Sequence, residues 1–97
     1  MARAQGRLGE AYFRQNNYAD AVEALEAAVN LYGRATDLNA RFFNMLATAY
    51  IRRDLSECNL AAPLFEQVLD ATTNELIVGQ ANEGLLECRR ATLGSDQ

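Results

Sequence analysis

The chain has 97 residues and a formal net charge of −4 at pH 7, and all nine of its basic residues are arginine. Because duplex nucleic acid demands a basic footprint, we expect no nucleic-acid partner for this acidic chain. The absence of histidine excludes Cys–His and Ser–His–Asp catalytic sets, and two cysteines alone make a poor zinc site. No apolar run approaches the ~18 residues of a membrane span. We therefore expect no enzyme activity, no cofactor, no metal and no membrane span.

Apolar residues recur at intervals of three and four along the chain, which is typical of amphipathic helices rather than strands. The pattern predicts five helices, over residues 2–15, 18–32, 37–53, 59–72 and 74–93. Gly33 is placed to end the second helix, and Thr36 to cap the third. Pro63 must lie near the start of the fourth helix, because an interior proline costs about 3 kcal/mol. We expect residues 1–97 to form one domain, and patterning that starts at residue 2 indicates a fragment of a longer chain.

The first and second helix pairs share a residue pattern. Four positions of the first predicted helix recur 38 residues later in the third: Gln5, Leu8, Gly9 and Tyr12 match Phe43, Leu46, Ala47 and Tyr50. Three positions of the second predicted helix recur 40 residues later in the fourth: Ala21, Leu25 and Ala28 match Ala61, Phe65 and Val68. Each copy therefore places a small residue inside both helices of a pair.

This pattern resembles the tetratricopeptide repeat, in which an aromatic residue, Leu, a small residue and Tyr are followed by Ala and Phe in the second helix. The first copy has Gln5 in place of the aromatic residue, both copies lack the usual proline between repeats, and both are longer than the family's ~34 residues. The resemblance implies an all-α, right-handed α–α superhelix. Its repeats would cover about 2–34 and 37–72. A partial repeat or capping helix would follow at about 74–93, and the sequence does not define which of its residues match those of the earlier repeats.

The resemblance also implies roles for the shared residues. Gly9 and Ala47 would lie where the helices of a pair cross most closely, with Ala21 and Ala61 facing them, because small side chains let backbones approach. Larger side chains would pack around the two crossings: Leu8, Tyr12, Leu25, Leu46, Tyr50 and Phe65.

Charge is sorted by helix, with a net of +2 on the first helix of each pair and −3 on the second, where the fourth helix is counted together with Glu57 just before it. By the resemblance, first helices line the concave face, so the groove would be rich in arginine. Helical spacing selects its residues: Arg3, Gly6, Glu10, Phe13, Arg14, Arg41, Asn44, Thr48, Ile51 and Arg52. We expect a protein-interaction module, a scaffold, adaptor or regulatory domain, whose groove binds an acidic segment or a C-terminal carboxylate. Alternatively, the arginines pair with acids on neighbouring helices and the face is only solvated.

Two further functions remain open on sequence alone. The end faces of a helical repeat cut between units are apolar, so the chain could form a homo-oligomer through them. The arginine-rich groove could instead belong to a sensory domain that binds a small acidic molecule.

The two cysteines, Cys58 and Cys88, could form a disulfide or remain as two free thiols. They lie at the start of the fourth helix and near the end of the fifth, ends that meet when antiparallel helices stack. A disulfide there would place the protein in an oxidising, extracytoplasmic compartment. Two separate buried thiols would instead be compatible with the cytoplasm.

Overall fold

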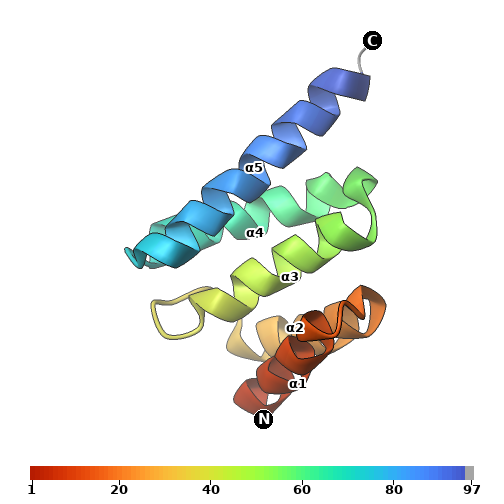
Figure 1. Ribbon diagram of the computed structural model, residues 1–97. Coiled ribbons are helices and arrows are strands. Elements are labelled where there is room, and N and C mark those ends of the chain that lie inside the picture. The colour runs from red at the N-terminus through yellow and green to blue at the C-terminus, as the bar shows by residue number, and fades with distance from the viewer. Residues whose placement is uncertain (96–97) are drawn as a thin grey trace.

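The computed structural model describes residues 1–95, which form five α-helices (Figure 1). These are α1 (Ala2–Arg14), α2 (Tyr18–Tyr32), α3 (Ala40–Arg53), α4 (Cys58–Ala71) and α5 (Glu75–Ser95), with a 3-10 turn (Leu55–Glu57) before α4. Each helix packs against the next along the chain, and α3 also packs against both α1 and α5. The α1–α2 pair and α5 thus lie at opposite ends, with α3 between them. The predicted all-helical class is confirmed.

The turn between α2 and α3 differs from the prediction. Gly33 ends α2 in the left-handed region, with a φ of 86°, as expected of a glycine stop. However, α3 begins at Ala40, because the buried side chain of Asn39 organises the preceding residues into a turn. Its Oδ1 accepts from the backbone N–H of Thr36 at 2.6 Å, and its Nδ2 donates to the carbonyl of Arg34 at 3.1 Å. Thr36 is therefore part of this turn and does not cap the helix.

The last two helices begin close to their predicted positions. The fourth helix, α4, starts at Cys58, so Pro63 lies in its second turn, near the start as expected. The amide N–H of Ile77 donates to Oδ1 of Asn74 at 3.1 Å, which caps the start of α5. This helix continues to Ser95, two residues beyond the predicted end.

The helices of the first pair approach closely at Gly9. A Cβ atom built on this glycine would lie 2.5 Å from Cγ of Leu25 and 3.2 Å from its backbone nitrogen. Ala21, Ala47 and Ala61 are fully buried. The small residues shared by the two copies therefore lie inside the helix packing, where no larger side chain fits.

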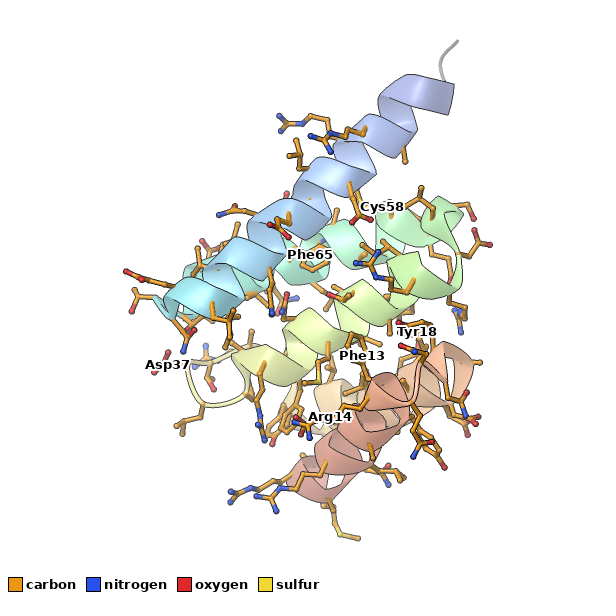
Figure 2. The ribbon with its side chains drawn as sticks, in the orientation of Figure 1. Phe13, Arg14, Tyr18, Asp37, Cys58 and Phe65 are labelled. Carbon is orange, nitrogen blue, oxygen red and sulfur yellow. A yellow bond between two sulfur atoms is a disulfide. The ribbon has the colours of Figure 1, made fainter. Side chains whose placement is uncertain are left out.

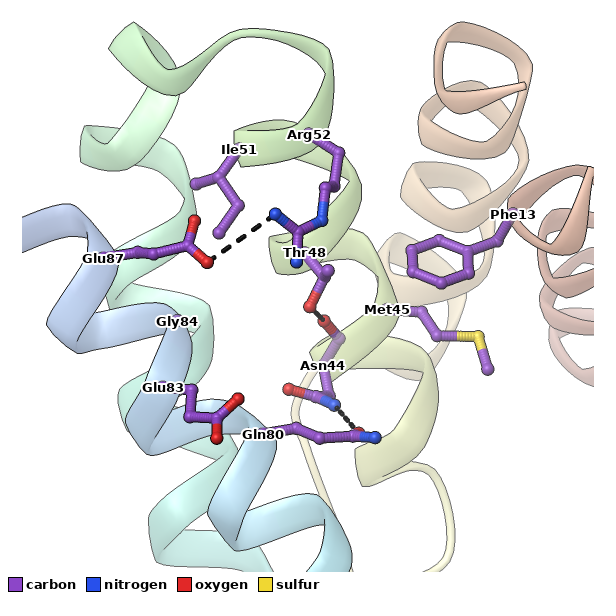
Figure 3. Close-up of a pocket in the computed structure, with 10 residues that line it drawn as sticks. All are labelled: Phe13, Asn44, Met45, Thr48, Ile51, Arg52, Gln80, Glu83, Gly84 and Glu87. Atoms are coloured by element: carbon purple, nitrogen blue, oxygen red, sulfur yellow. Dashed lines mark hydrogen bonds and ion pairs between the residues drawn. The ribbon is translucent and has the colours of Figure 1, made fainter. Parts of the chain in front are cut away.

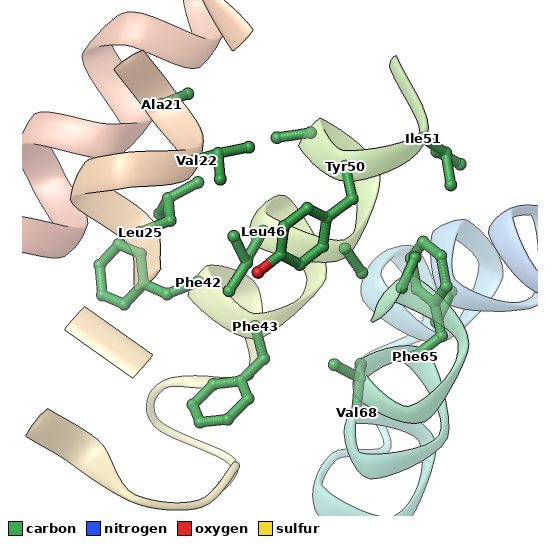
Figure 4. Close-up of a cluster of buried hydrophobic side chains, with 14 of the residues drawn as sticks. Ala21, Val22, Leu25, Phe42, Phe43, Leu46, Tyr50, Ile51, Phe65 and Val68 are labelled. Carbon is green, nitrogen blue, oxygen red and sulfur yellow. The ribbon is translucent and has the colours of Figure 1, made fainter. Parts of the chain in front are cut away.

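Corresponding residues of the two copies have matching burial on the second helices but not on the first. All six residues of the second helices are completely buried: Ala21, Leu25, Ala28, Ala61, Phe65 and Val68. Leu46 and Tyr50 of α3 are buried as well, in contact with the cluster shown in Figure 4. By contrast, Leu8 is 46% exposed and Tyr12 is half-buried. Within the described residues no helix covers this face of α1, so Leu8 differs from its expected packing role.

The fifth helix repeats the contacts of α3 at the same 38-residue interval. Gly6 of α1 is buried against the ring of Phe42, and 38 residues later the Asn44 side chain donates to Gln80 at 2.8 Å. Three residues of α5 are buried in the same way as their counterparts 38 positions earlier in α3: Ala81, Gly84 and Cys88 match Phe43, Leu46 and Tyr50. The register of α5, left open by the sequence, is thereby fixed.

A disulfide attaches α5 to α4. Cys58 and Cys88 are bonded, with their Cα atoms 5.5 Å apart and a separation of 30 positions in sequence. Figure 2 shows Cys58 at the start of α4, next to α5. Farther along the same interface, Gly84 leaves room for the ring of Phe65. Of the two alternatives that the sequence left open for these cysteines, the structure shows the disulfide.

Tyr50 joins the second pair of helices to the first. Its hydroxyl donates to the Glu26 carboxylate of α2, and the Arg53 guanidinium lies 5.8 Å from the centre of its ring. Burial, followed by the hydrogen bond to Glu26, raises the pKa of Tyr50 well above its ordinary value of about 10. The neutral phenol is therefore the form that the fold stabilises.

Replacing Gly9 with alanine tests the close helix crossing. We expect Gly9→Ala to lower the free energy of unfolding by about 1–3 kcal/mol, since its Cβ would overlap Leu25. Gly79→Ala is the matched control, because nothing lies within 4 Å of its Cβ position. It should stabilise the helix by up to about 1 kcal/mol. Urea unfolding followed by circular dichroism measures both, and equal effects would contradict the crossing.

Replacing Tyr50 with phenylalanine tests its link to Glu26. Tyr50→Phe should cost about 1–3 kcal/mol at neutral pH, through loss of a hydrogen bond to a charged group. Because the folded pKa is raised, Tyr50 binds its proton more tightly in the folded chain, so stability should fall as pH rises above about 10. Tyr50→Phe should remove this part of the pH dependence. Tyr12→Phe, at the corresponding position of α1, should cost less at neutral pH, and an equal loss of stability there would contradict the assignment.

Candidate functional site

A pocket of about 320 Å³ lies between α1, α3 and α5 (Figure 3). Phe13 from α1 and Met45 and Ile51 from α3 supply its apolar walls. Its other lining residues are Asn44, Thr48 and Arg52 from α3, and Gln80, Glu83, Gly84 and Glu87 from α5. Five of the ten groove residues predicted from the sequence therefore line one pocket: Phe13, Asn44, Thr48, Ile51 and Arg52.

The other five predicted groove residues lie outside this pocket. Arg3 and Arg41 line a separate hollow, of about 510 Å³, with Tyr32, Leu38 and Phe42 among its walls. Glu10 and Arg14 form an ion pair along α1 at 3.1 Å. Gly6 is buried beneath Phe42, so it presents no surface to a partner, contrary to the expectation. Its small size serves helix packing instead.

The apolar residues of the pocket are held by their own neighbours. The ring of Phe13 meets that of Tyr18 edge-on, with 5.6 Å between ring centres, across the α1–α2 turn (Figure 2). Ile51 is buried and forms part of the core. The Thr48 hydroxyl donates to the carbonyl of Asn44 at 2.8 Å, one turn earlier in α3. These residues therefore form a fixed surface rather than a set of loose side chains.

Most of the expected groove arginines contact a carboxylate. Arg41 Nη2 lies 3.9 Å from Glu10, and its guanidinium also stands 4.7 Å from the centre of the Phe42 ring. Arg52 Nη1 lies 3.6 Å from Glu87 of α5. Since Arg14 pairs with Glu10 as well, three of the four arginines have an acidic neighbour. Such exposed pairs contribute only about 0–1 kcal/mol to stability, but they offset the positive charge of the groove.

Asn44 is the polar residue most deeply set in the pocket, with only 5% of its surface exposed. Its Nδ2 donates to Oε1 of Gln80 at 2.8 Å, which links α3 to α5. Among the side chains that the structure describes, those of residues 1–91, its Oδ1 is the one buried polar atom without a hydrogen-bond partner. Leaving such an acceptor unpaired costs about 1–3 kcal/mol. A native structure that retains this cost has a strong hydrogen-bonding position available to a ligand.

The α5 wall of the pocket is the part that sequence reasoning missed. Gln80, Glu83, Gly84 and Glu87 were not among the expected groove residues because the register of the fifth helix was open. One available signal was the 38-residue interval between the first two copies. Extended once more from Phe42, it reaches Gln80 and would have placed these residues beside α3.

The described part of the chain contains neither a metal-binding cluster nor a membrane-spanning helix. No three His, Cys, Asp or Glu side chains of residues 1–95 gather closely enough to hold a metal ion. None of the helices described has the length and apolar character needed to cross a membrane.

Comparisons with known proteins give no relative. No protein-family model matches the chain, and neither a curated protein nor a solved structure matches it. The tetratricopeptide resemblance therefore rests on the residues of this chain and on their arrangement.

Proposed function

We propose that this chain is a protein-interaction module that binds a peptide or protein segment in the groove formed by α1, α3 and α5. The observation that carries the proposal is the pocket of about 320 Å³ with Asn44 in its wall. Ligand sites are usually concave, largely apolar and equipped with a few fixed polar groups, and this volume falls within their range. Phe13, Met45 and Ile51 supply the apolar part of this pocket and Asn44 a fixed polar group, while the α5 side is more polar than in most ligand sites.

The proposal includes a tetratricopeptide-like architecture, a right-handed superhelix of two helix hairpins plus a fifth helix. Its support is the recurrence of contacts at a 38-residue interval, from the Gly6–Phe42 contact to the Asn44–Gln80 hydrogen bond. In such an arrangement the first helix of every unit lines one continuous inner surface. The pocket between α3 and α5 would then be one segment of a longer groove.

The disulfide supports a compartment for this function. Disulfides persist in oxidising environments and are rare in the cytosol, where thiols are kept reduced. Because Cys58–Cys88 holds α5 on α4, and α5 forms one wall of the groove, the proposed site depends on that bond. We therefore place the working protein in an extracytoplasmic compartment.

A bulky residue at the centre of the groove tests the proposal. The assay is fluorescence polarisation of a randomised library of short labelled peptides, followed by isolation of the bound sequences. Thr48→Tyr should reduce binding of the selected peptides at least tenfold, about 1.4 kcal/mol, by filling the pocket. Glu66→Tyr places the same side chain on the exposed surface of α4 and should leave affinity unchanged. Equal effects, or no selectable peptide, would contradict a groove function.

Self-association is a second candidate, supported by the exposed apolar residues at the two ends of the helix stack. At one end, Leu8 and Tyr12 line a hollow with Ala24 and Ala27 of α2. At the other, Leu76 of α5 is 70% exposed. The residues of α3 that correspond to Leu8 and Tyr12 are buried against α2, so this face of α1 matches a surface that binds a helix within the same chain.

Light scattering at increasing protein concentration separates the second candidate from the first. If the end face self-associates, Leu8→Glu should shift the chain toward monomer. Leu55→Glu is the matched control, because Leu55 is 45% exposed compared with 46% for Leu8 but lies in the turn before α4. A wild-type chain that stays monomeric at millimolar concentration would remove this candidate and leave peptide binding unaffected.

A further inference from the structure

Two hydrogen-bond acceptors in the pocket are left without partners. Oδ1 of Asn44 is buried and unpaired, and the Glu83 carboxylate makes no ion pair with any of the side chains described, those of residues 1–91. Figure 3 shows both groups directed into the same space between α3 and α5, with Gln80 at its edge. This part of the pocket can therefore accept hydrogen bonds from a ligand, and its carboxylate favours a positively charged one.

We infer that this space binds the basic side chain of a partner peptide, a lysine ammonium or an arginine guanidinium. The inference rests on the proposed peptide-binding function and specifies its ligand. The cationic group would donate one N–H to Oδ1 of Asn44 and another to the carboxylate of Glu83. Both bonds suit the chemistry, since ammonium and guanidinium groups have several donors and no acceptor. Bonds between ionised partners are also the strongest hydrogen bonds that proteins make.

The charges around the pocket favour a cation over an anion. Arg52 is the one cationic residue among its lining residues, and it lies 3.6 Å from Glu87. Two glutamates thus face one arginine, which leaves the lining with a net negative charge. An acidic ligand, as expected from the arginine count of the sequence, would meet Glu83 without a compensating group. The inferred ligand is therefore basic, whereas the sequence predicted an acidic one.

The apolar walls of the pocket suit the stem of a basic side chain. Lys and Arg carry methylene chains that pack along apolar surface while the charged head reaches a polar group. Phe13 and Met45 offer such a surface on the α1 side of the pocket, across α3 from Glu83. Because Oδ1 is shielded from solvent, a donor reaches it only when side chains of the pocket wall move aside, and Gln80 and Glu83 are the exposed lining residues of α5. A slender, flexible side chain meets this requirement.

Peptide binding measured at low salt, about 50 mM, tests the inference. Three otherwise identical libraries of short peptides carry lysine, glutamine or glutamate at a fixed central position. The lysine library should bind at least about tenfold tighter than the glutamate library. Glu83→Gln should reduce this preference by about fivefold or more, whereas Glu66→Gln, on the exposed surface of α4, should leave it unchanged. Equal or reversed preference in a chain that binds peptides would overturn the inference and leave the proposed function standing.

A titration with n-butylammonium tests the cation site independently of peptide binding. The readout is the NMR signal of the Asn44 side-chain amide, which reports directly on the pocket. A saturable shift in the wild-type chain that Glu83→Gln abolishes would support the site, and would identify free alkylammonium as a sufficient ligand. Absence of peptide binding together with this shift would reject only the peptide-binding function. No shift, or a shift that Glu83→Gln retains, would overturn the inferred site.

Discussion

The groove depends on one attachment, that of α5 to α4. The Cys58–Cys88 disulfide fixes one part of the interface, and the close contact of Gly84 with the Phe65 ring fixes another. With α5 in this position, Gln80 reaches Asn44 and Glu87 reaches Arg52, so α3 gains a facing wall. Closing a loop of about 30 residues removes chain entropy from the unfolded state, worth about 3–4 kcal/mol in the loop-closure treatment. That is a substantial contribution for a chain that buries only a modest core.

Small residues explain why the other helices stack as they do. Gly9 and Ala47 occupy corresponding places in α1 and α3, and Gly6 leaves room for Phe42 where these two helices meet. Side chains on α3 face α1, α2, α4 and α5, so this helix is the centre of the molecule (Figure 4). On the side of α3 that faces α5, the Nδ2 of Asn44 has a hydrogen-bond partner but its Oδ1 has none. The packing of α3 against α5 thereby leaves a buried, unpaired acceptor in the wall of the pocket.

Sequence reasoning reached the fold more readily than the site, for identifiable reasons. Periodicity and Gly33 define helices through local chemistry, so five helices could be predicted closely. The start of α3 could not, because it depends on Asn39 bonding backward to Thr36 and Arg34 rather than on a cap. Pairing of the cysteines followed from which helix ends meet. The charge of the groove did not follow from counting arginines, since the carboxylate that faces Arg52 comes from α5, whose register the sequence left open.

The central claim is that α5 is a fixed wall of the site and that the disulfide holds it there. Amide hydrogen exchange measures the protection of the backbone amides in each helix, and it can be compared between the oxidised chain and a Cys58→Ser/Cys88→Ser variant. The account predicts protected amides in the middle of α5 when the bond is intact. In the variant these amides should exchange much faster, while those of α1 and α2 keep their protection. Rapid exchange throughout α5 in the oxidised chain, or unchanged protection of α5 in the variant, would contradict the account.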